Sequence, residues 1–286
     1  MADIKIAAIK RAGIYSPNHI GNDAAILNLT AEQLRKRGCE VKIYSEEQLI
    51  AGEVSEDIII NMSRDPRSLA LLQKKEDDGA LVINSAYGVE NCTRERMTRI
   101  LLGSNIPHPE SLIVNTDEVL TAKMKQTDMT KAWVKRADSQ TMHKEDVTYV
   151  RHPEEAQEML QEYFLRGIKR AVVNRHIEGE LLKFYGIMGT PYFQCFFHFG
   201  SRDLKGHDED KPKFDHDALK RDCESAADAL GIKIYGGDAI IDAEGNYTII
   251  DFNDWPSFAP FRAEASAVIA RYILAEIKNH INTKKS

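Results

Sequence analysis

The chain has 286 residues, of which 43% are hydrophobic and 29% charged, and its formal net charge is −6. This composition is typical of a globular protein long enough for one large domain, or for two or three small domains that share a cleft. The acidic balance argues against general binding of nucleic acid, and the scattered lysines and arginines argue against a basic membrane-binding patch.

No apolar run approaches the roughly 20 residues that a membrane-spanning helix needs. The first ten residues lack the basic start and apolar stretch of a signal peptide. The four cysteines, Cys39, Cys92, Cys195 and Cys223, form no C-x-x-C pair. We therefore expect a cytoplasmic protein without membrane contact, whose cysteines are reduced and structural.

The first ninety residues predict alternating strands and helices. Asn22 is a candidate cap for a helix that runs to about Arg37, and Gly38 follows as a stop signal. Short, apolar strands separated by helices indicate a parallel sheet covered on both faces. The predicted strands are residues 4–9, 41–44, 57–61 and 80–83.

The remainder predicts further strands and helices of mixed order. A helix over residues 93–103 precedes a proline-bearing turn, and another helix begins at Pro153 and ends before Gly167. The last two helices are expected over residues 216–230 and 263–280. The predicted strands are residues 133–136, 147–150, 171–175, 181–187, 192–199, 239–241 and 247–252, and the polar stretch 203–213 has no predicted structure.

Polar residues gather at the last two predicted strands. Asp238 stands at the start of one strand, after Gly236-Gly237, whereas Asp251 and Asn253 stand two apart at the end of the next. Residues two apart project from one face, and antiparallel pairing would bring Asp238 within reach of them. Two carboxylates and an amide oxygen suit Mg²⁺, which prefers oxygen ligands shared with phosphates. The alternative is that these acids face solvent at strand ends.

The spacing of this motif carries a family resemblance. Tyr235-Gly236-Gly237-Asp238, followed by Asp251-Phe252-Asn253 and Pro256, resembles the metal-binding end of ATP-grasp enzymes. Three earlier segments resemble the branch of glutathione synthetases, ribosomal-protein glutamate ligases and D-alanine–D-alanine ligases. They are the crossing between the first two domains (Asn84-Ser85, Asn91-Cys92 and Ile106-Pro107-His108-Pro109), the strand Trp133-Val134-Lys135, and the hinge Ile177-Glu178-Gly179-Glu180.

The resemblance implies the α/β ATP-grasp fold. A parallel α/β domain over residues 1–90 would precede two α+β subdomains, residues 91–173 and 174–286, which enclose the nucleotide. The third part would carry the metal site. The resemblance covers most of the chain from Asp57 onward, whereas the first fifty residues match only in fold pattern.

The resemblance also implies roles for single residues. Lys135 would offer a compact cation to the phosphates of ATP, with Arg94 in place of a lysine on the first helix of the second domain. Glu180 would accept hydrogen bonds from the ribose hydroxyls. Backbone groups near His176, Ile177 and Glu178 would read the adenine edge.

The metal and catalytic roles follow from the same resemblance. Asp238, Asp251 and Asn253 would hold Mg²⁺ or Mn²⁺ against the transferring phosphoryl group. Lys183, which would also contact the nucleotide, Arg262 and Arg221 are the candidate cations for stabilising an acyl phosphate.

The chain departs from the family pattern in one loop. Residues 137–144 contain no glycine where family members carry a glycine-rich loop over the phosphates, so Ser139, His143 or Lys144 would have to supply side-chain contacts.

Three functions remain open at this point. The first is a carboxylate–amine ligase that forms an acyl phosphate from ATP, with small-molecule substrates near residues 16–19 and 61–64. The second is a kinase that phosphorylates a hydroxyl group, for which Arg64, Arg67, Arg94 and Arg96 would suit a phosphorylated acceptor. The third is a nucleotide-binding protein without catalysis. A homodimer is the default expectation for an enzyme of this size.

Overall fold

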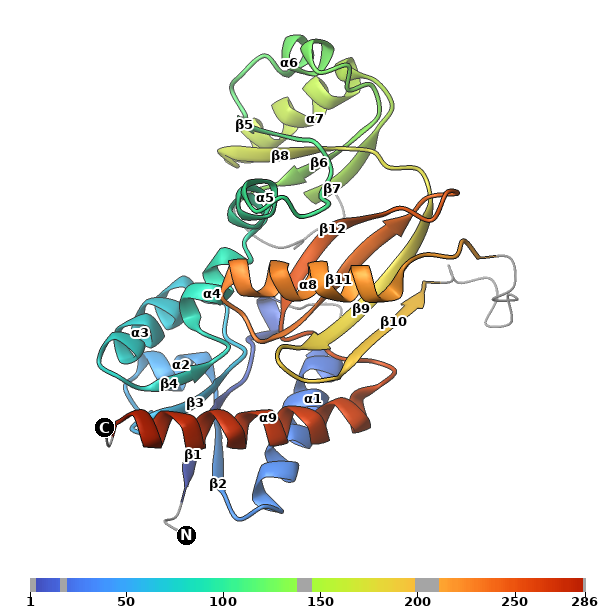
Figure 1. Cartoon of the computed structure of the whole chain (residues 1–286). Helices are drawn as coiled ribbons and strands as arrows, with labels where there is room; N and C mark the ends of the chain where they lie inside the picture. Colours follow the sequence, from blue (N-terminus) through green and yellow to red (C-terminus); the bar gives the residue numbers. More distant parts are fainter. Residues whose placement is uncertain (1–3, 16–19, 138–145, 199–210, 285–286) are drawn as a thin grey trace.

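The computed structural model describes residues 4–15, 20–137, 146–198 and 211–284, and within them the chain forms three four-stranded sheets (Figure 1). The predicted α/β class, with a parallel sheet followed by two α+β units, is confirmed. No helix among the described residues is long and apolar enough to cross a membrane.

The first sheet is parallel and has the strand order β2-β1-β3-β4. Its central strand is buried on both faces because its apolar residues, Ile6 to Ile9, meet helices on either side. Its elements are β1 (Lys5–Ile9), the short 3-10 turn η1 (Gly13–Tyr15), α1 (Ile20–Arg35), β2 (Glu40–Tyr44), α2 (Glu46–Ile50), β3 (Ile58–Asn61), α3 (Pro66–Asp77), β4 (Leu81–Ile83) and α4 (Ala86–Asn91).

The start predicted for the first helix is wrong. Asn22 lies inside α1, which already includes Ile20, so it is not the capping residue. Capping side chains do begin two other helices of this region, since Ser45 accepts from the backbone of Gln48 and Asp65 accepts from the backbone of Arg67. The end of α1 is close to the prediction because Gly38 adopts a left-handed conformation just beyond it.

The second sheet is antiparallel, with the order β5-β8-β6-β7. Its elements are β5 (Ser111–Asn115), α6 (Leu120–Gln126), β6 (Ala132–Arg136), β7 (Val147–Val150), α7 (Pro153–Leu165) and β8 (Arg170–Arg175), preceded by α5 (Arg94–Gly103). Helices α6 and α7 bury one face of the sheet through Leu120, Met124, Leu160 and Tyr163. Because side chains alternate along β6, Trp133 and Lys135 project from the opposite, uncovered face.

The third sheet is also antiparallel, with the order β10-β9-β11-β12. Its elements are β9 (Glu180–Ile187), β10 (Phe193–Phe197), α8 (His216–Leu230), β11 (Ile234–Ile241) and β12 (Tyr247–Asp254). Leu182, Phe184, Tyr235 and Phe252 pack with α8 on one face. The alternate residues of the same strands, which include Asp238 and Asp251, therefore lie on the other face.

The last helix, α9 (Arg262–Thr283), returns to the first sheet. Ile269, Ile273 and Ile277 share a buried cluster with Ile26 and Leu27 of α1, and Figure 1 shows α9 crossing beside α1. Burial of this apolar face explains the long amphipathic helix at the end of the chain.

Candidate functional site

The residues predicted to bind metal lie opposite one another on β11 and β12. Asp238 pairs with Asp251, and Gly236 pairs with Asn253, so the three polar side chains share one face of the sheet. The amide Nδ2 of Asn253 donates to Asp251 Oδ2 over 2.9 Å. Burial, reinforced by the nearby Asp251 carboxylate, raises the pKa of Asp238. The two acids are therefore close enough to repel each other, which a cation between them would relieve.

The position predicted for Asp238 at a strand start needs correction, because β11 begins earlier, at Ile234. The strand runs through Gly236-Gly237 because the neighbouring backbone comes too close for a side chain. A Cβ atom on Gly237 would lie 2.2 Å from the Asp251 carbonyl oxygen, and one on Gly236 would lie 2.8 Å from the Phe184 carbonyl oxygen. The two glycines thus allow the tight pairing that aligns the polar residues.

A lysine accompanies the acids on the neighbouring strand. Lys183 of β9 pairs with Asp238, and its Nζ lies 2.8 Å from Asp238 Oδ1. This ion pair is partly exposed, with 30% of the lysine and 25% of the aspartate side chain accessible. The amine partly offsets the rise in the pKa of Asp238.

Two further cations approach from the second sheet and α5. Lys135 Nζ lies 3.4 Å from the carbonyl oxygen of Ile250, directly before Asp251. Burial, reinforced by the charge of Arg94, lowers the pKa of Lys135 to about 8, whereas Asp251 and Asp238 oppose this shift. Arg94 is 9% exposed, and its Nη1 donates to the carbonyl oxygen of Arg136 over 2.9 Å. The polar faces of the second and third sheets therefore meet at Lys135.

The sequence reading did not give a role to His108, which lies beside this group. Its Nδ1 donates to the Ile249 carbonyl oxygen over 2.7 Å, while its Nε2 has no partner among the described residues. Burial lowers the pKa of His108 to about 4, so the ring is neutral at pH 7. The only signal in the sequence was its position between Pro107 and Pro109 in the predicted crossing.

An aromatic cluster lies farther along the uncovered face of the second sheet. The rings of Trp133 and Tyr149 are 5.3 Å apart, and those of Tyr149 and His176 are 4.9 Å apart. Trp133 Nε1 donates to His176 Nδ1 over 3.1 Å. Trp133 remains 36% exposed, so a partly open aromatic surface lies two residues from Lys135 on the same strand.

Comparison with known structures identifies the fold. The D-alanine–D-alanine ligase of Bacillus anthracis, complexed with ATP, matches with a TM-score of 0.74 at 15% identity, covering 99% of each chain. The D-alanine–D-alanine ligase of Coxiella burnetii matches with a TM-score of 0.72 at 13% identity, covering 99% of this chain and 98% of the other. The ATP-grasp ligase PsnB, complexed with a minimal precursor, matches with a TM-score of 0.62 at 16% identity, covering 96% of this chain and 99% of the other.

The chain has the ATP-grasp fold. The predicted resemblance to the D-alanine–D-alanine ligase branch is confirmed at the level of the fold. No family model matches the sequence, and no curated protein matches it.

Of the residues predicted to form the hinge, Glu178 and Glu180 are exposed and ion-paired. Glu178 is paired with Lys131 over 2.7 Å and with His176 over 3.3 Å. Glu180 begins β9 and is paired with Lys211 over 2.7 Å. Ile177 is half-buried between His176 and Glu178. The hinge thus begins beside the aromatic cluster, but Glu180 is already engaged by a lysine.

The candidate cations for an acyl phosphate lie in different places. Lys183 lies at the acids, as described. Arg262 begins α9, where its Nε donates to the Ser257 carbonyl oxygen and its Nη2 to Asn22 Oδ1. Arg221 is exposed on α8, which covers the opposite face of the sheet from Asp238, so the structure does not bring it to the site.

A buried charge cluster that the sequence did not predict lies beside the residues predicted to bind metal. Asp254 is 1% exposed and accepts from Arg11 and Arg64 of the first domain; the Arg11–Asp254 distance is 3.0 Å. Arg11 also pairs with Asp23 over 2.9 Å. This cluster ties the first sheet to the end of β12. Arg64 was predicted in a substrate loop, but the other predicted substrate loop, residues 16–19, lies outside the described residues.

A cavity of about 530 Å³ opens on this polar surface. Its walls include Lys183, Gly236-Gly237, Asp238 and Asn253 from the third sheet, and Arg11 and Arg64 from the first domain. Ser139, His143 and Lys144 of the glycine-free loop, and most of the polar stretch 203–213, lie outside the described residues. Among the described residues, no group of three or more histidine, cysteine, aspartate or glutamate side chains is placed to hold a metal. The predicted set, two carboxylates and an asparagine, is not a group of that kind.

Proposed function

We propose that this chain is an ATP- and Mg²⁺-dependent ligase that joins a carboxylate to an amine through an acyl phosphate. The observation that carries the proposal is the approach of Lys135 to the strand that bears Asp251: its Nζ lies 3.4 Å from the Ile250 carbonyl oxygen, and the charges of Asp251 and Asp238 act on its pKa. A buried lysine near two acids suits a polyphosphate with its cation. The matched structures bear the names of ligases or synthetases, among them a D-cycloserine synthetase, and one of the D-alanine–D-alanine ligases is complexed with ATP.

The aromatic cluster supplies the base-binding surface in this proposal. The adenine would lie against Trp133 and Tyr149, with backbone groups near His176 and Ile177 at its edge. Glu180 would hold the ribose after releasing Lys211, with which it forms an ion pair whose carboxylate is 51% exposed. From Trp133 the same strand leads to Lys135, so a nucleotide along β6 would place its phosphates near Lys135 and Arg94.

The donor set of the third sheet fits Mg²⁺. Asp238, Asp251 and Asn253 would hold the ion, which would neutralise charge on the transferring γ-phosphoryl group. With Mg²⁺ bound to Asp238, the amine of Lys183 would be available to the phosphate oxygens that develop charge. His108, neutral at pH 7, would line the same polar region without adding charge that competes with Lys135.

In this proposal, the side chains of the protein position the substrates and exclude water from the reaction. A carboxylate substrate would reach the phosphates from the 530 Å³ cavity, where Arg11, Arg64 and Lys183 give a cationic lining beside the acids. An acyl phosphate hydrolyses when it is exposed to water, so the site must close before it forms. The division into residues 1–90, 91–173 and 174–286, with the nucleotide between the last two parts, belongs to this proposal.

The decisive experiment is incubation with Mg-ATP and a panel of carboxylates and amines, with ADP and free phosphate measured separately. We expect ADP and phosphate only when both substrates are present, and a hydroxamate when hydroxylamine replaces the amine. ATP use that leaves the phosphoryl group on a hydroxyl acceptor, with no hydroxamate, would establish a kinase instead. ATP binding without turnover across the panel would establish the non-catalytic alternative. Asn253→Ala provides the inactive control.

A further inference from the structure

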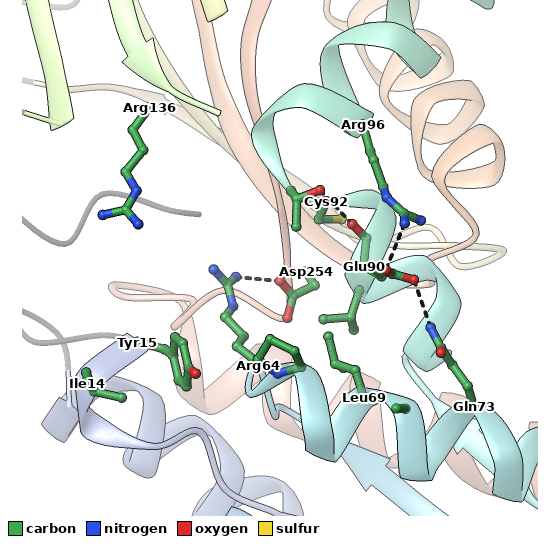
Figure 2. A pocket seen from close by; sticks show the side chains of 14 residues that line it. Ile14, Tyr15, Arg64, Leu69, Gln73, Glu90, Cys92, Arg96, Arg136 and Asp254 are labelled. Atoms are coloured by element: carbon green, nitrogen blue, oxygen red, sulfur yellow. Dashed lines mark hydrogen bonds and ion pairs between the residues drawn. The ribbon is translucent and has the colours of Figure 1, made fainter. Parts of the chain in front are cut away.

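A second cavity, of about 590 Å³, lies next to the 530 Å³ cavity, and residues of the first sheet's helices, α5, β6 and β12 line it. Figure 2 shows it between the η1 turn with Ile14 and Tyr15, helix α3 with Leu69 and Gln73, and the α4–α5 junction with Glu90 and Cys92. Its volume lies within the usual range for a small-molecule site. The proposed ATP and metal residues do not line it, so it has no occupant in the function described so far.

One wall of the second cavity is apolar. Leu69 and Val89 are almost fully buried and present carbon to the cavity from α3 and α4, with Ala70 exposed beside Leu69. Ile14, which is 62% exposed, adds apolar surface at the opposite side of the cavity. A ligand with an apolar body would remove these surfaces from water.

The other wall offers cations. Arg64 is 9% exposed, and although one of its Nη atoms pairs with Asp254, its buried Nε has no hydrogen-bond partner among the described residues. At the rim, Arg96 pairs with Glu90 over 2.8 Å, and Figure 2 shows Arg136 directed toward the cavity from β6. A buried guanidinium donor without an acceptor calls for an acceptor oxygen.

The two cavities share a wall. Arg64 and Asp254 line both of them, and Asp254 directly follows the proposed metal ligand Asn253. A carboxylate held at Arg64 would therefore lie at the wall that the two cavities share, close to the proposed metal ligands. An apolar body attached to it would extend along Leu69 and Val89.

We propose that the second cavity binds the apolar body of the carboxylate substrate, which makes the acid to be activated a hydrophobic one with an extended chain. The carboxylate head lies at Arg64, and the chain lies against Leu69, Ala70 and Val89. The assignment as a substrate site rests on the proposed ligase function, whereas the binding of a hydrophobic acid does not depend on it.

Binding is tested without nucleotide or metal, by calorimetric titration with straight-chain acids from acetate to decanoate. Each added methylene should tighten binding about fourfold until the apolar wall is covered. Octanol should bind at least tenfold more weakly than octanoate because it has no charge for Arg64. Absence of octanoate binding, or an affinity that does not depend on chain length, would overturn the proposal.

A matched pair of variants on α3 locates the site. Ala70→Glu places an acid in the cavity and should weaken octanoate binding at least tenfold, whereas Leu71→Glu places the same acid on the neighbouring exposed residue outside the lining and should change it less than twofold. Both substitutions are at exposed helix positions, so both variants should fold. If octanoate binds the Ala70→Glu variant and the parent with equal affinity, octanoate does not bind in this cavity and the proposal is overturned.

Turnover separates this inference from the proposed function. With Mg-ATP and hydroxylamine, octanoate should give hydroxamate at a lower KM than acetate, and Ala70→Glu should raise the KM for octanoate at least tenfold with kcat changed less than threefold. Hydroxamate formation from short acids alone, without octanoate binding, would leave the ligase function standing and reject the hydrophobic substrate. Octanoate binding that is sensitive to Ala70→Glu, without any ATP use, would reject the ligase function and retain the binding site.

Discussion

Lys183 Nζ lies 2.8 Å from Asp238 Oδ1, on directly opposed residues of β9 and β11. The amine thus contacts a carboxylate that the proposed function gives to Mg²⁺. Because one oxygen of Asp238 already carries a cation, a metal ion must displace the amine or share the carboxylate with it. Lys183 is therefore both a competitor for the metal site and, once displaced, a cation beside the phosphates.

This competition gives a first prediction. Replacement of Lys183 by Met should tighten Mn²⁺ binding several-fold in the absence of ATP at pH 8, because no amine has to be displaced from Asp238. Spectroscopic titration of free Mn²⁺ measures the affinity. Lys233→Met, which removes a lysine paired with Asp228 outside the site, is the control and should leave the affinity unchanged. Weaker Mn²⁺ binding in Lys183→Met would show that the amine supports the site.

Loss of a proposed metal ligand should affect turnover far more than stability. Asn253→Ala removes an oxygen ligand and Asp251→Asn removes the negative charge of another, and a catalytic metal supplies several kcal/mol of transition-state stabilisation, so activity should fall roughly 100-fold or more. The melting temperature should change little because both side chains are partly exposed at the cleft. Glu244→Gln in the exposed β11–β12 turn is the control. Full activity of either variant at limiting Mg²⁺ would contradict the metal site.

The pKa of Lys135 predicts how ATP affinity depends on pH. In the free protein this lysine has a pKa of about 8, so it is charged below pH 8 and loses its charge above it. Polyphosphate binds the charged amine, so the dissociation constant for ATP should be flat below pH 8 and rise above it by up to about tenfold per pH unit. Lys135→Arg keeps its charge throughout and should abolish this rise. The same rise in Lys135→Arg would assign it to another group.

The two tryptophans of the chain allow a direct test of the adenine surface. Trp133 is 36% exposed, whereas Trp255 is fully buried, so acrylamide quenches mainly Trp133. ATP should protect the fluorescence from acrylamide, and Trp133→Ala should weaken ATP binding about tenfold by removing an aromatic contact. Trp133→Phe, which keeps an aromatic ring, should recover most of the affinity. Unchanged acrylamide quenching in saturating ATP would place the adenine elsewhere.

Local patterns were sufficient to predict most of the fold. The parallel first sheet follows from short apolar strands separated by helices, and the structure gives α8 the predicted bounds, from His216 to the residue before Gly231. The pairing of Asp238 with Asp251 follows from hairpin geometry and side-chain alternation. These features depend on residues that are close in sequence, so spacing and turn chemistry define them.

The remaining features depend on contacts between distant parts of the chain. Arg11 and Arg64 reach Asp254 across 243 and 190 residues, and no local pattern marks such partners. The packing of α9 on α1 likewise joins the two ends of the described chain. The sequence also could not show that Arg221 lies away from the site, because it does not say which face of the third sheet α8 covers.

The buried partners of Asp254 give the last prediction, which concerns stability. Arg11 and Arg64 are 6% and 9% exposed at the side chain and share this one 1% exposed carboxylate. Asp254→Asn keeps the shape but removes the charge that both guanidinium groups contact, so the free energy of unfolding should fall by about 3 kcal/mol or more in urea titration. Asp217→Asn, at an exposed acid on α8, should change it by less than about 0.5 kcal/mol. The cluster joins the first sheet to the end of β12. An Asp254→Asn variant with an unchanged free energy of unfolding would show that water or another acid balances the charge of the two arginines.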